Sequence, residues 1–164
     1  MMRLIATFFY VGLIPFAPGT FGSLAAIPVA YGLHWLGGFP LLGLATLVVF
    51  AVGLYATTVV TAGSLDHDPS SIVIDEVAGQ WIALLPLSAG LWFASVAPHV
   101  FPWPGWVGAF LLFRLFDIWK PWPVSWADNM ATPMGVMLDD VIAGVMAAIL
   151  VTIAAGISHG MMGQ

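Results

Sequence analysis

The sequence predicts an all-α, polytopic membrane protein with four or five membrane-embedded helices. Of its 164 residues, 61% are hydrophobic and only 7% are charged, and the mean hydropathy is +1.03. Soluble domains carry about a quarter charged residues, so this chain has too few polar side chains to cover a globular surface in water. Five apolar stretches follow one another along it, and the length favours a single domain over residues 1–164.

The apolar stretches reach, or nearly reach, the length of a spanning helix. Such a helix needs about 20 apolar residues, and about 17 at the short end. We expect helices over five ranges: Phe21–Leu36, Leu41–Thr61, Val77–Ala97, Trp103–Phe116 and Val141–Ile157. The second and third are long enough, whereas the other three require tilt, local thinning of the bilayer or incomplete spanning.

Three prolines interrupt the first hydrophobic region, at Pro15, Pro18 and Pro28. We therefore expect a broken or re-entrant N-terminal segment, because backbone groups freed within a bilayer must meet protein or water. A topology with four full spans plus this segment is the alternative to five spans.

The segment that follows Pro18 has the composition of a helix start. Gly19 and Gly22 permit a tight backbone, and Thr20 or Ser23 can cap the helix. The alternative is that the same helix start contacts a phosphate or a metal, since its backbone N–H groups can hold an anion.

The charged residues fall on one side of this topology. With a cytoplasmic N-terminus, five crossings place Thr61–Glu76 and Asp117–Asp140 inside, with outer loops near Gly37–Pro40 and Pro98–Pro102. Neither outer loop contains Lys, Arg, Asp or Glu, so the few cations lie at or near the inner side, as the positive-inside rule requires. In either orientation, the even number of crossings brings all eight acids to one face.

Two pairs of adjacent acids enter apolar helices, Asp75–Glu76 and Asp139–Asp140. Gly79 and Gly144 follow about one turn later and allow another helix or a ligand to approach closely. Each pair could simply complement a helix dipole at an N-terminus. Ionisable groups at membrane depth are usually functional, however, and clustered carboxylates cannot all ionise without a counter-cation.

A metal site made of these four carboxylates would contain oxygen ligands alone. Oxygen ligands favour a hard ion, Mg²⁺ before Ca²⁺ or Mn²⁺. The chain has no cysteine, which excludes thiolate metal sites and cysteine-nucleophile phosphatase chemistry.

The three cations of the chain are Arg3, Arg114 and Lys120, too few for the basic surface that binds nucleic acid. Arg114, Asp117 and Lys120 have the spacing i, i+3, i+6 and would share one stripe of a helix that Pro121 ends. The Arg–Asp pair could be structural. Beside a carboxylate site, however, an Arg guanidinium can bind two phosphate oxygens at once and a Lys ammonium can add a point charge. We therefore favour a role in phosphate recognition.

These elements, in their order along the chain, resemble the phosphatidylglycerophosphatase A family of bacterial inner-membrane lipid phosphatases. The resemblance covers nearly the whole chain and departs from the family at Thr132-Pro133, where a glycine pair is usual and where we expect a different loop path. The matching runs are Ala17–Leu24; Asp68-Pro69 leading to Ile72–Glu76 with Gly79; Phe113–Ile118 with Lys120–Pro123; and Gly135–Asp140 with Ala143-Gly144.

The resemblance implies Mg²⁺-dependent hydrolysis of phosphatidylglycerol phosphate to phosphatidylglycerol and inorganic phosphate. It implies a multi-pass protein of the inner membrane, in contact with membrane lipids, with its active site on the cytoplasmic face. The family's acids correspond to Asp75, Glu76, Asp117, Asp139 and Asp140, which we expect to be catalytic, and its basic residues correspond to Arg114 and Lys120, which we expect at the substrate. From the residues themselves we expect the metal at Asp75, Glu76, Asp139 and Asp140, and a substrate contact at Thr20 and Ser23. We expect in-line attack by a metal-activated water, with an aspartyl-phosphate as the alternative.

A second class of function is a transporter or channel that binds a divalent cation with the same acids. It would need the acids deep in the spans, whereas they lie at span ends, where Arg114 and Lys120 would oppose cation passage. The metal count and the oligomeric state stay open at this point.

Overall fold

The protein is helical throughout the part that the computed structural model describes, residues 1–64 and 69–162. Its elements are α1 (Met2–Ala6), the short 3₁₀ helix η1 (Val11–Leu13), α2 (Pro18–Thr61), α3 (Ile74–Phe93), α4 (Trp103–Trp119), α5 (Val124–Asp128) and α6 (Pro133–Met162). No strand occurs in these ranges, and the predicted all-α class is confirmed.

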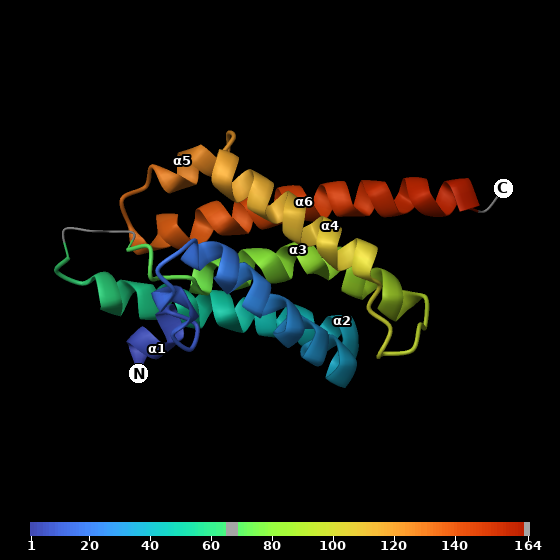
Figure 1. Ribbon diagram of the computed structural model, residues 1–164, viewed down its shortest axis with the longest axis horizontal. Coiled ribbons are helices and arrows are strands. Elements are labelled where there is room, and N and C mark those ends of the chain that lie inside the picture. Colours follow the sequence, from blue (N-terminus) through green and yellow to red (C-terminus); the bar gives the residue numbers. More distant parts are fainter. Residues whose placement is uncertain (65–68, 163–164) are drawn as a thin grey trace.

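Helix α2 supplies the first two predicted helices, because it folds back on itself at a glycine pair. Gly37 and Gly38 have non-helical backbone angles, and Gly38 has φ 62°. A Cβ atom at Gly38 would overlap the Trp92 ring, so glycine is needed for both its backbone angle and the close contact. The two halves of α2 run in opposite directions (Figure 1), and the predicted turn near Gly37–Pro40 is confirmed.

Helix α3 is the centre of the bundle and packs against α2, α4 and α6. Polar contacts tie it to the first half of α2. The Trp81 indole N–H donates to the Ala26 carbonyl at 2.9 Å, and His34 Nδ1 lies 2.8 Å from Ser88 Oγ. Figure 1 shows that the starts of α2, α3 and α6 and the end of α4 lie at one end of the bundle, hereafter the charged end.

Two glycines let α3 and α6 touch backbone to backbone. A Cβ at Gly79 would overlap the Asp140 carbonyl, and a Cβ at Gly144 would overlap the Gly79 carbonyl. Small residues at a helix crossing permit such an approach. The close approach expected of these glycines is confirmed, and the partner is another helix.

The N-terminal segment is broken, as predicted. After α1, three consecutive residues, Phe8, Phe9 and Tyr10, have positive φ, and Val73 N donates to Ala6 O at 2.9 Å, which ties the segment to the start of α3. Pro28 lies within the predicted helix Phe21–Leu36, and α2 continues through it. In a well-packed helix, neighbouring elements can satisfy the carbonyl that a proline frees.

Helix α6 begins at Pro133, well before the predicted Val141. Thr132 Oγ1 accepts a hydrogen bond from Gly135 N at 3.1 Å, and proline suits the first position of a helix, so Thr132-Pro133 forms a helix start. Asp139 and Asp140 consequently lie about two turns inside α6. The dipole interpretation of this pair as acids at a helix N-terminus is wrong.

Two of the helices, α2 and residues Pro133–Ser158 of α6, are long and apolar enough to cross a membrane. Large apolar side chains are exposed along much of the bundle, among them Leu47, Leu111, Ile118 and Ile153. Monomeric soluble proteins rarely expose apolar surface on this scale.

Candidate functional site

The charged end contains a cavity of about 240 Å³ at the junction of α2, α3, α4 and α6. Every charged side chain that the sequence assigned to the site lines it: Asp75, Glu76, Arg114, Asp117, Lys120, Asp139 and Asp140. The predicted gathering of the acids and two cations is therefore confirmed for these seven residues, while their individual roles stay predictions.

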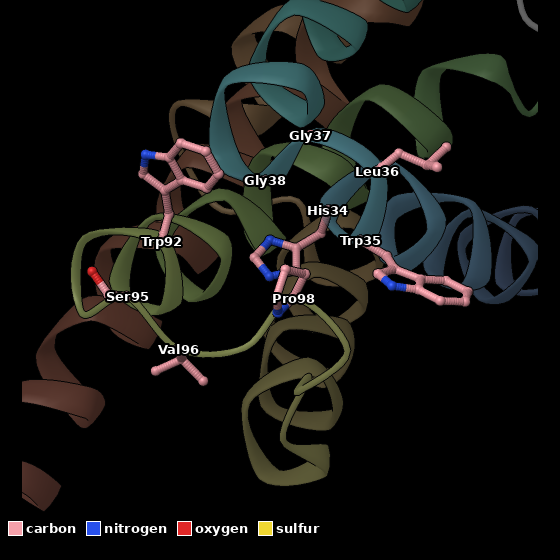
Figure 2. A pocket seen from close by; sticks show the side chains of 9 residues that line it. All are labelled: His34, Trp35, Leu36, Gly37, Gly38, Trp92, Ser95, Val96 and Pro98. Atoms are coloured by element: carbon pink, nitrogen blue, oxygen red, sulfur yellow. The ribbon is translucent and has the colours of Figure 1, made fainter.

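A larger cavity of about 510 Å³ lies at the opposite end, around the turn in α2 (Figure 2). Its lining includes His34, Trp35 and Trp92, and contains no Asp, Glu, Lys or Arg among the described residues. Volume alone would select this cavity, but it lacks the charged groups that phosphoryl or metal chemistry requires.

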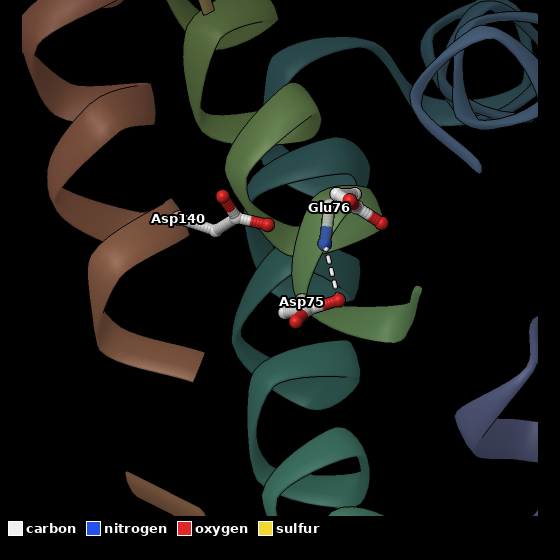
Figure 3. A group of neighbouring side chains, drawn as sticks. All are labelled: Asp75, Glu76 and Asp140. Carbon is white, nitrogen blue, oxygen red and sulfur yellow. Dashed lines mark hydrogen bonds between the residues drawn. The ribbon is translucent and has the colours of Figure 1, made fainter. Parts of the chain in front are cut away.

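Three carboxylates at the charged end lie close together. One oxygen from each of Asp75, Glu76 and Asp140 lies within 4.8 Å of the others, with Asp140 reaching across from α6 to α3 (Figure 3). Asp75 Oδ1 also accepts a hydrogen bond from Glu76 N at 2.9 Å. Asp75 and Asp140 are buried, and we name these three residues the carboxylate cluster.

The first turn of α2 closes over the cluster at Gly19. A Cβ atom there would overlap Glu76 Oε1 and lie 3.2 Å from Arg114 Nη1. Glycine here lets the helix backbone pass close to the ion pair without displacing the Glu76 carboxylate. The absence of a side chain at Gly19 thus leaves space for the Glu76 carboxylate.

Arg114 is held by two carboxylates. Its Nη1 lies 2.5 Å from Asp117 Oδ2, one turn along α4, and 3.5 Å from Glu76 Oε1. The guanidinium therefore links α4 to the carboxylate cluster. The predicted i, i+3 pair is confirmed, and its side chains are only 14% and 11% exposed.

Lys120 does not continue the helical stripe predicted for it. Helix α4 ends at Trp119, and Lys120 has φ 47°, so its side chain leaves the line of Arg114 and Asp117. Its ammonium donates to Asp139 Oδ2 at 2.9 Å and to Asp128. The stripe prediction is wrong at this position, although the predicted helix end at Pro121 is correct to within one residue.

The protonation of Lys120 follows from these partners. Burial alone lowers the pKa of its ammonium, but hydrogen bonds and charge attraction from Asp128 and Asp139 outweigh burial, and the pKa is raised above its ordinary value. Lys120 is therefore a cation at any physiological pH.

The two acid pairs share a local geometry but have different partners. Asp139 Oδ1 accepts a hydrogen bond from Asp140 N at 2.9 Å, as Asp75 does from Glu76. Asp140 then joins the carboxylate cluster, whereas Asp139 faces Lys120. Three of the four expected metal ligands are thus brought together, and Asp139 is held by a cation instead.

The carboxylate cluster fits a small divalent cation. At Mg–O distances of about 2.1 Å, opposite ligands of an octahedral ion lie about 4.2 Å apart, and the three oxygens all lie within 4.8 Å of one another, so small side-chain adjustments would bring them to one ion. Five carboxylates and two cations line the cavity, and such an excess of buried negative charge calls for a counter-cation. All donors are oxygens, as Mg²⁺ prefers.

Thr20 and Ser23 do not line the cavity. Ser23 is fully buried and donates to the Gly19 carbonyl at 2.9 Å. Neither residue caps α2, whose N-cap is Ala17 without a side-chain hydrogen bond, so the capping prediction is wrong. Their assignment to the substrate stays a prediction.

Sequence reasoning missed Asp128 and Ser70. Asp128 fixes Lys120 from α5, and Ser70 lines the cavity. Spacing along one helix does not predict this contact. Lys120 follows the end of α4 with a left-handed backbone, and Asp128 belongs to α5. Asp68, part of one matching run, lies outside the described residues.

Among the described residues, a helical bundle with large exposed apolar side chains brings five carboxylates, a guanidinium and an ammonium to one cavity, a combination that suits an enzyme of phosphate chemistry. Within that class, residues 4–155 match the family model described as Phosphatidylglycerophosphatase A. The chain therefore belongs to the phosphatidylglycerophosphatase A family and is a phosphatase.

Curated relatives agree with the family match. The chain is 40% identical over 148 residues to phosphatidylglycerophosphatase A of Escherichia coli strain K12, covering 89% of this chain and 78% of that protein. It is 37% identical over 151 residues to the Haemophilus influenzae phosphatidylglycerophosphatase A, covering 92% and 86%. A Bacteroides thetaiotaomicron protein with the provisional name phosphatidylinositol-3-phosphatase is 39% identical over 157 residues, covering 92% and 91%. No solved structure matches the chain.

Proposed function

We propose that this phosphatase hydrolyses phosphatidylglycerol phosphate to phosphatidylglycerol and inorganic phosphate, and that it depends on Mg²⁺. The observation that carries the proposal is the cavity at the charged end. It places the carboxylate cluster beside Arg114, so a divalent cation and a phosphate monoester could be held together. The names of two relatives support the substrate.

The metal would be held by Asp75, Glu76 and Asp140. A bound Mg²⁺ supplies two things in such sites: a lowered pKa for a water ligand and neutralisation of phosphate oxygens. Asp75 and Asp140 are preorganised for this role, because the Gly79–Gly144 crossing fixes the two helices against each other. Preorganised ligands need little rearrangement when the substrate binds.

The two cations would receive the phosphate. Arg114 presents a planar fork that matches two phosphate oxygens, and Asp117 fixes its orientation. Lys120 adds a point charge whose position is set by Asp128 and Asp139. Both cations would offset charge on the phosphate oxygens as the bond to the glycerol oxygen breaks.

The start of α2 is a further anion-binding element. Ala17, Pro18 and Gly19 line the cavity, and the first N–H groups of a helix have no acceptor within it. These groups and the positive end of the helix dipole favour a phosphate here. In this segment the substrate contact would come from the backbone.

We further propose a multi-pass protein of the inner membrane whose charged end faces the cytoplasm. Exposed tryptophans lie near both ends, Trp119, Trp122 and Trp126 at the charged end and Trp103 at the other, as interface anchors do. A site at the interface would take the phosphorylated headgroup while the acyl chains stay in lipid. The transporter alternative is not favoured, because the family is one of phosphatases.

The test is phosphate release by the purified chain in detergent. Phosphatidylglycerol phosphate is the substrate, with Mg²⁺ or with excess chelator, and phosphatidylinositol 3-phosphate is the comparison because of the Bacteroides relative. The proposal expects release from phosphatidylglycerol phosphate that chelator abolishes and Mg²⁺ restores. Equal release with chelator would contradict the metal assignment, and a preference for the inositol lipid would overturn the substrate.

A further inference from the structure

Gln80 lies inside the bundle with an amide that has no partner. The residue is fully buried, and neither Nε2 nor Oε1 has a hydrogen-bond partner among the described residues. Burying an unpaired amide is costly, and an apolar side chain of the same shape would avoid the cost. Such a residue calls for a functional explanation.

Gln80 is a buried residue of α3 one helical turn from Glu76. It follows Glu76 by four residues on α3, and side chains four apart share one face of a helix. The neighbouring Gly79 is covered by the Phe113 ring, so the end of α4 that carries Arg114 packs against this part of α3. Gln80 is therefore one turn deeper than the Glu76–Arg114 ion pair.

Arg114 has an unpaired atom of its own. Its Nε is buried and has no hydrogen-bond partner in the part of the chain that the structure describes, although its Nη1 meets two carboxylates. Guanidinium Nε–H is a donor, and the Gln80 amide offers both a donor and an acceptor. One water held by this amide, Arg114 Nε and the Glu76 carboxylate would have three partners, the usual number for a buried water.

We propose that Gln80 is a positioning residue that, through one buried water, fixes the Arg114 guanidinium and the Glu76 carboxylate beneath the phosphate. Gln80 does not touch the substrate and acts through these two residues. The inference deepens the proposed function and uses its phosphate-release assay as one readout.

Gln80→Met tests the proposal, because methionine keeps the length and removes the amide. We expect phosphate release to fall at least about tenfold, as for other residues that orient a site. The melting temperature should fall by only a few degrees, since methionine fills the same space and each lost hydrogen bond contributes about 1 kcal/mol. A variant that keeps more than half of the wild-type activity would overturn the proposal.

Thr57→Val is the matched control. Thr57 is also fully buried with an unpaired side-chain oxygen, but it does not line the cavity. Valine has nearly the same shape, so activity within about twofold of wild type and an unchanged or higher melting temperature are expected. The same activity loss in Thr57→Val and Gln80→Met would show a general effect of the core and contradict a positioning role.

A double variant separates positioning from packing. If Gln80 acts through Arg114, adding Gln80→Met to Arg114→Lys should cost less than about a further twofold, because the two effects are coupled. A full tenfold further loss would contradict the proposal. Should Gln80→Met not fold, Gln80→Asn and Gln80→Leu are equal in size, and the proposal expects the Asn variant to be clearly more active.

Binding of inorganic phosphate distinguishes failure of this inference from failure of the proposed function. The dissociation constant for phosphate, measured by calorimetry, should weaken at least about fivefold in Gln80→Met and stay unchanged in Thr57→Val. A wild-type chain that binds phosphate but releases none from phosphatidylglycerol phosphate would overturn only the substrate. Equal phosphate affinity in wild type and Gln80→Met would overturn the role of Gln80.

Discussion

Both ends of the helical bundle contain a cavity, and the two cavities differ in the side chains that line them. The larger, at the turn of α2, is lined by aromatic, apolar and small residues with one histidine, His34. The smaller, at the charged end, is lined by five carboxylates and two cations. The charge of the lining, and not the volume of the cavity, therefore distinguishes the candidate site from the cavity at the opposite end.

The two ends also use glycine differently. At the opposite end, Gly38 has φ 62° and serves a turn that sends α2 back along the bundle. At the charged end, Gly19, Gly79 and Gly144 lie within helices and serve close contact with a carboxylate or another backbone. Substitution at the charged end should therefore affect catalysis, whereas substitution at the opposite end should affect stability.

The largest effect is expected from the carboxylate cluster. Asp75→Asn and Asp140→Asn each keep the side-chain shape and remove one charge from the proposed metal site. Phosphate release should fall by more than about a hundredfold, the upper end for residues that only support a metal ligand. The assay is Mg²⁺-dependent phosphate release from phosphatidylglycerol phosphate, and near-wild-type activity in either variant would remove that residue from the site.

Arg114→Lys should have the next largest effect. Lysine keeps the charge but cannot form the planar fork, and its contacts with Asp117 and Glu76 would change. We expect a loss of about tenfold to a hundredfold in kcat/KM. Activity equal to wild type would mean that a point charge is sufficient and that the fork is unimportant.

Gly19→Ala should cost about tenfold in activity and about 1–3 kcal/mol in the free energy of unfolding, because the new methyl group overlaps Glu76. Gly32→Ala is the matched control. It lies in the same helix with nothing within 4 Å of the position that a Cβ atom would take, so alanine there should leave activity unchanged. Equal activities of the two variants would contradict the claim that Gly19 leaves the space in which the Glu76 carboxylate is positioned.

The smallest effect on activity is expected at the opposite end. His34→Leu leaves the fully buried Ser88 hydroxyl without its partner, so the free energy of unfolding should fall by about 1–3 kcal/mol. Phosphate release by the folded fraction should stay within about twofold of wild type. A large activity loss without a loss of stability would show that the larger cavity takes part in catalysis.

Much of the fold and the charged end could be predicted from the sequence. The apolar stretches gave the five long helical segments, because stretches of this length and composition form helices. The order of acids along them placed Asp75, Glu76 and Asp140 at one end, since two crossings return the chain to the same face. Only two helices among the described residues, however, are long and apolar enough to span a membrane by themselves.

What could not be predicted depends on contacts between elements. The partner of Lys120 is set by a left-handed residue at the end of α4, and spacing along a helix says nothing about such a turn. The early start of α6 depends on the Thr132 cap, which hydropathy does not detect. The position of Lys120 and the early start of α6 together give the adjacent residues Asp139 and Asp140 different partners.

The most direct test of the account is the affinity of the purified chain for Mn²⁺, used as a spectroscopic probe in place of Mg²⁺. It compares Asp140→Asn with its neighbour Asp139→Asn and needs no catalytic turnover. Because Asp140 lies in the carboxylate cluster and Asp139 is held by Lys120, Mn²⁺ affinity should fall more than about tenfold in Asp140→Asn. It should change less than about threefold in Asp139→Asn. Equal losses in the two variants, or a larger loss in Asp139→Asn, would contradict the account.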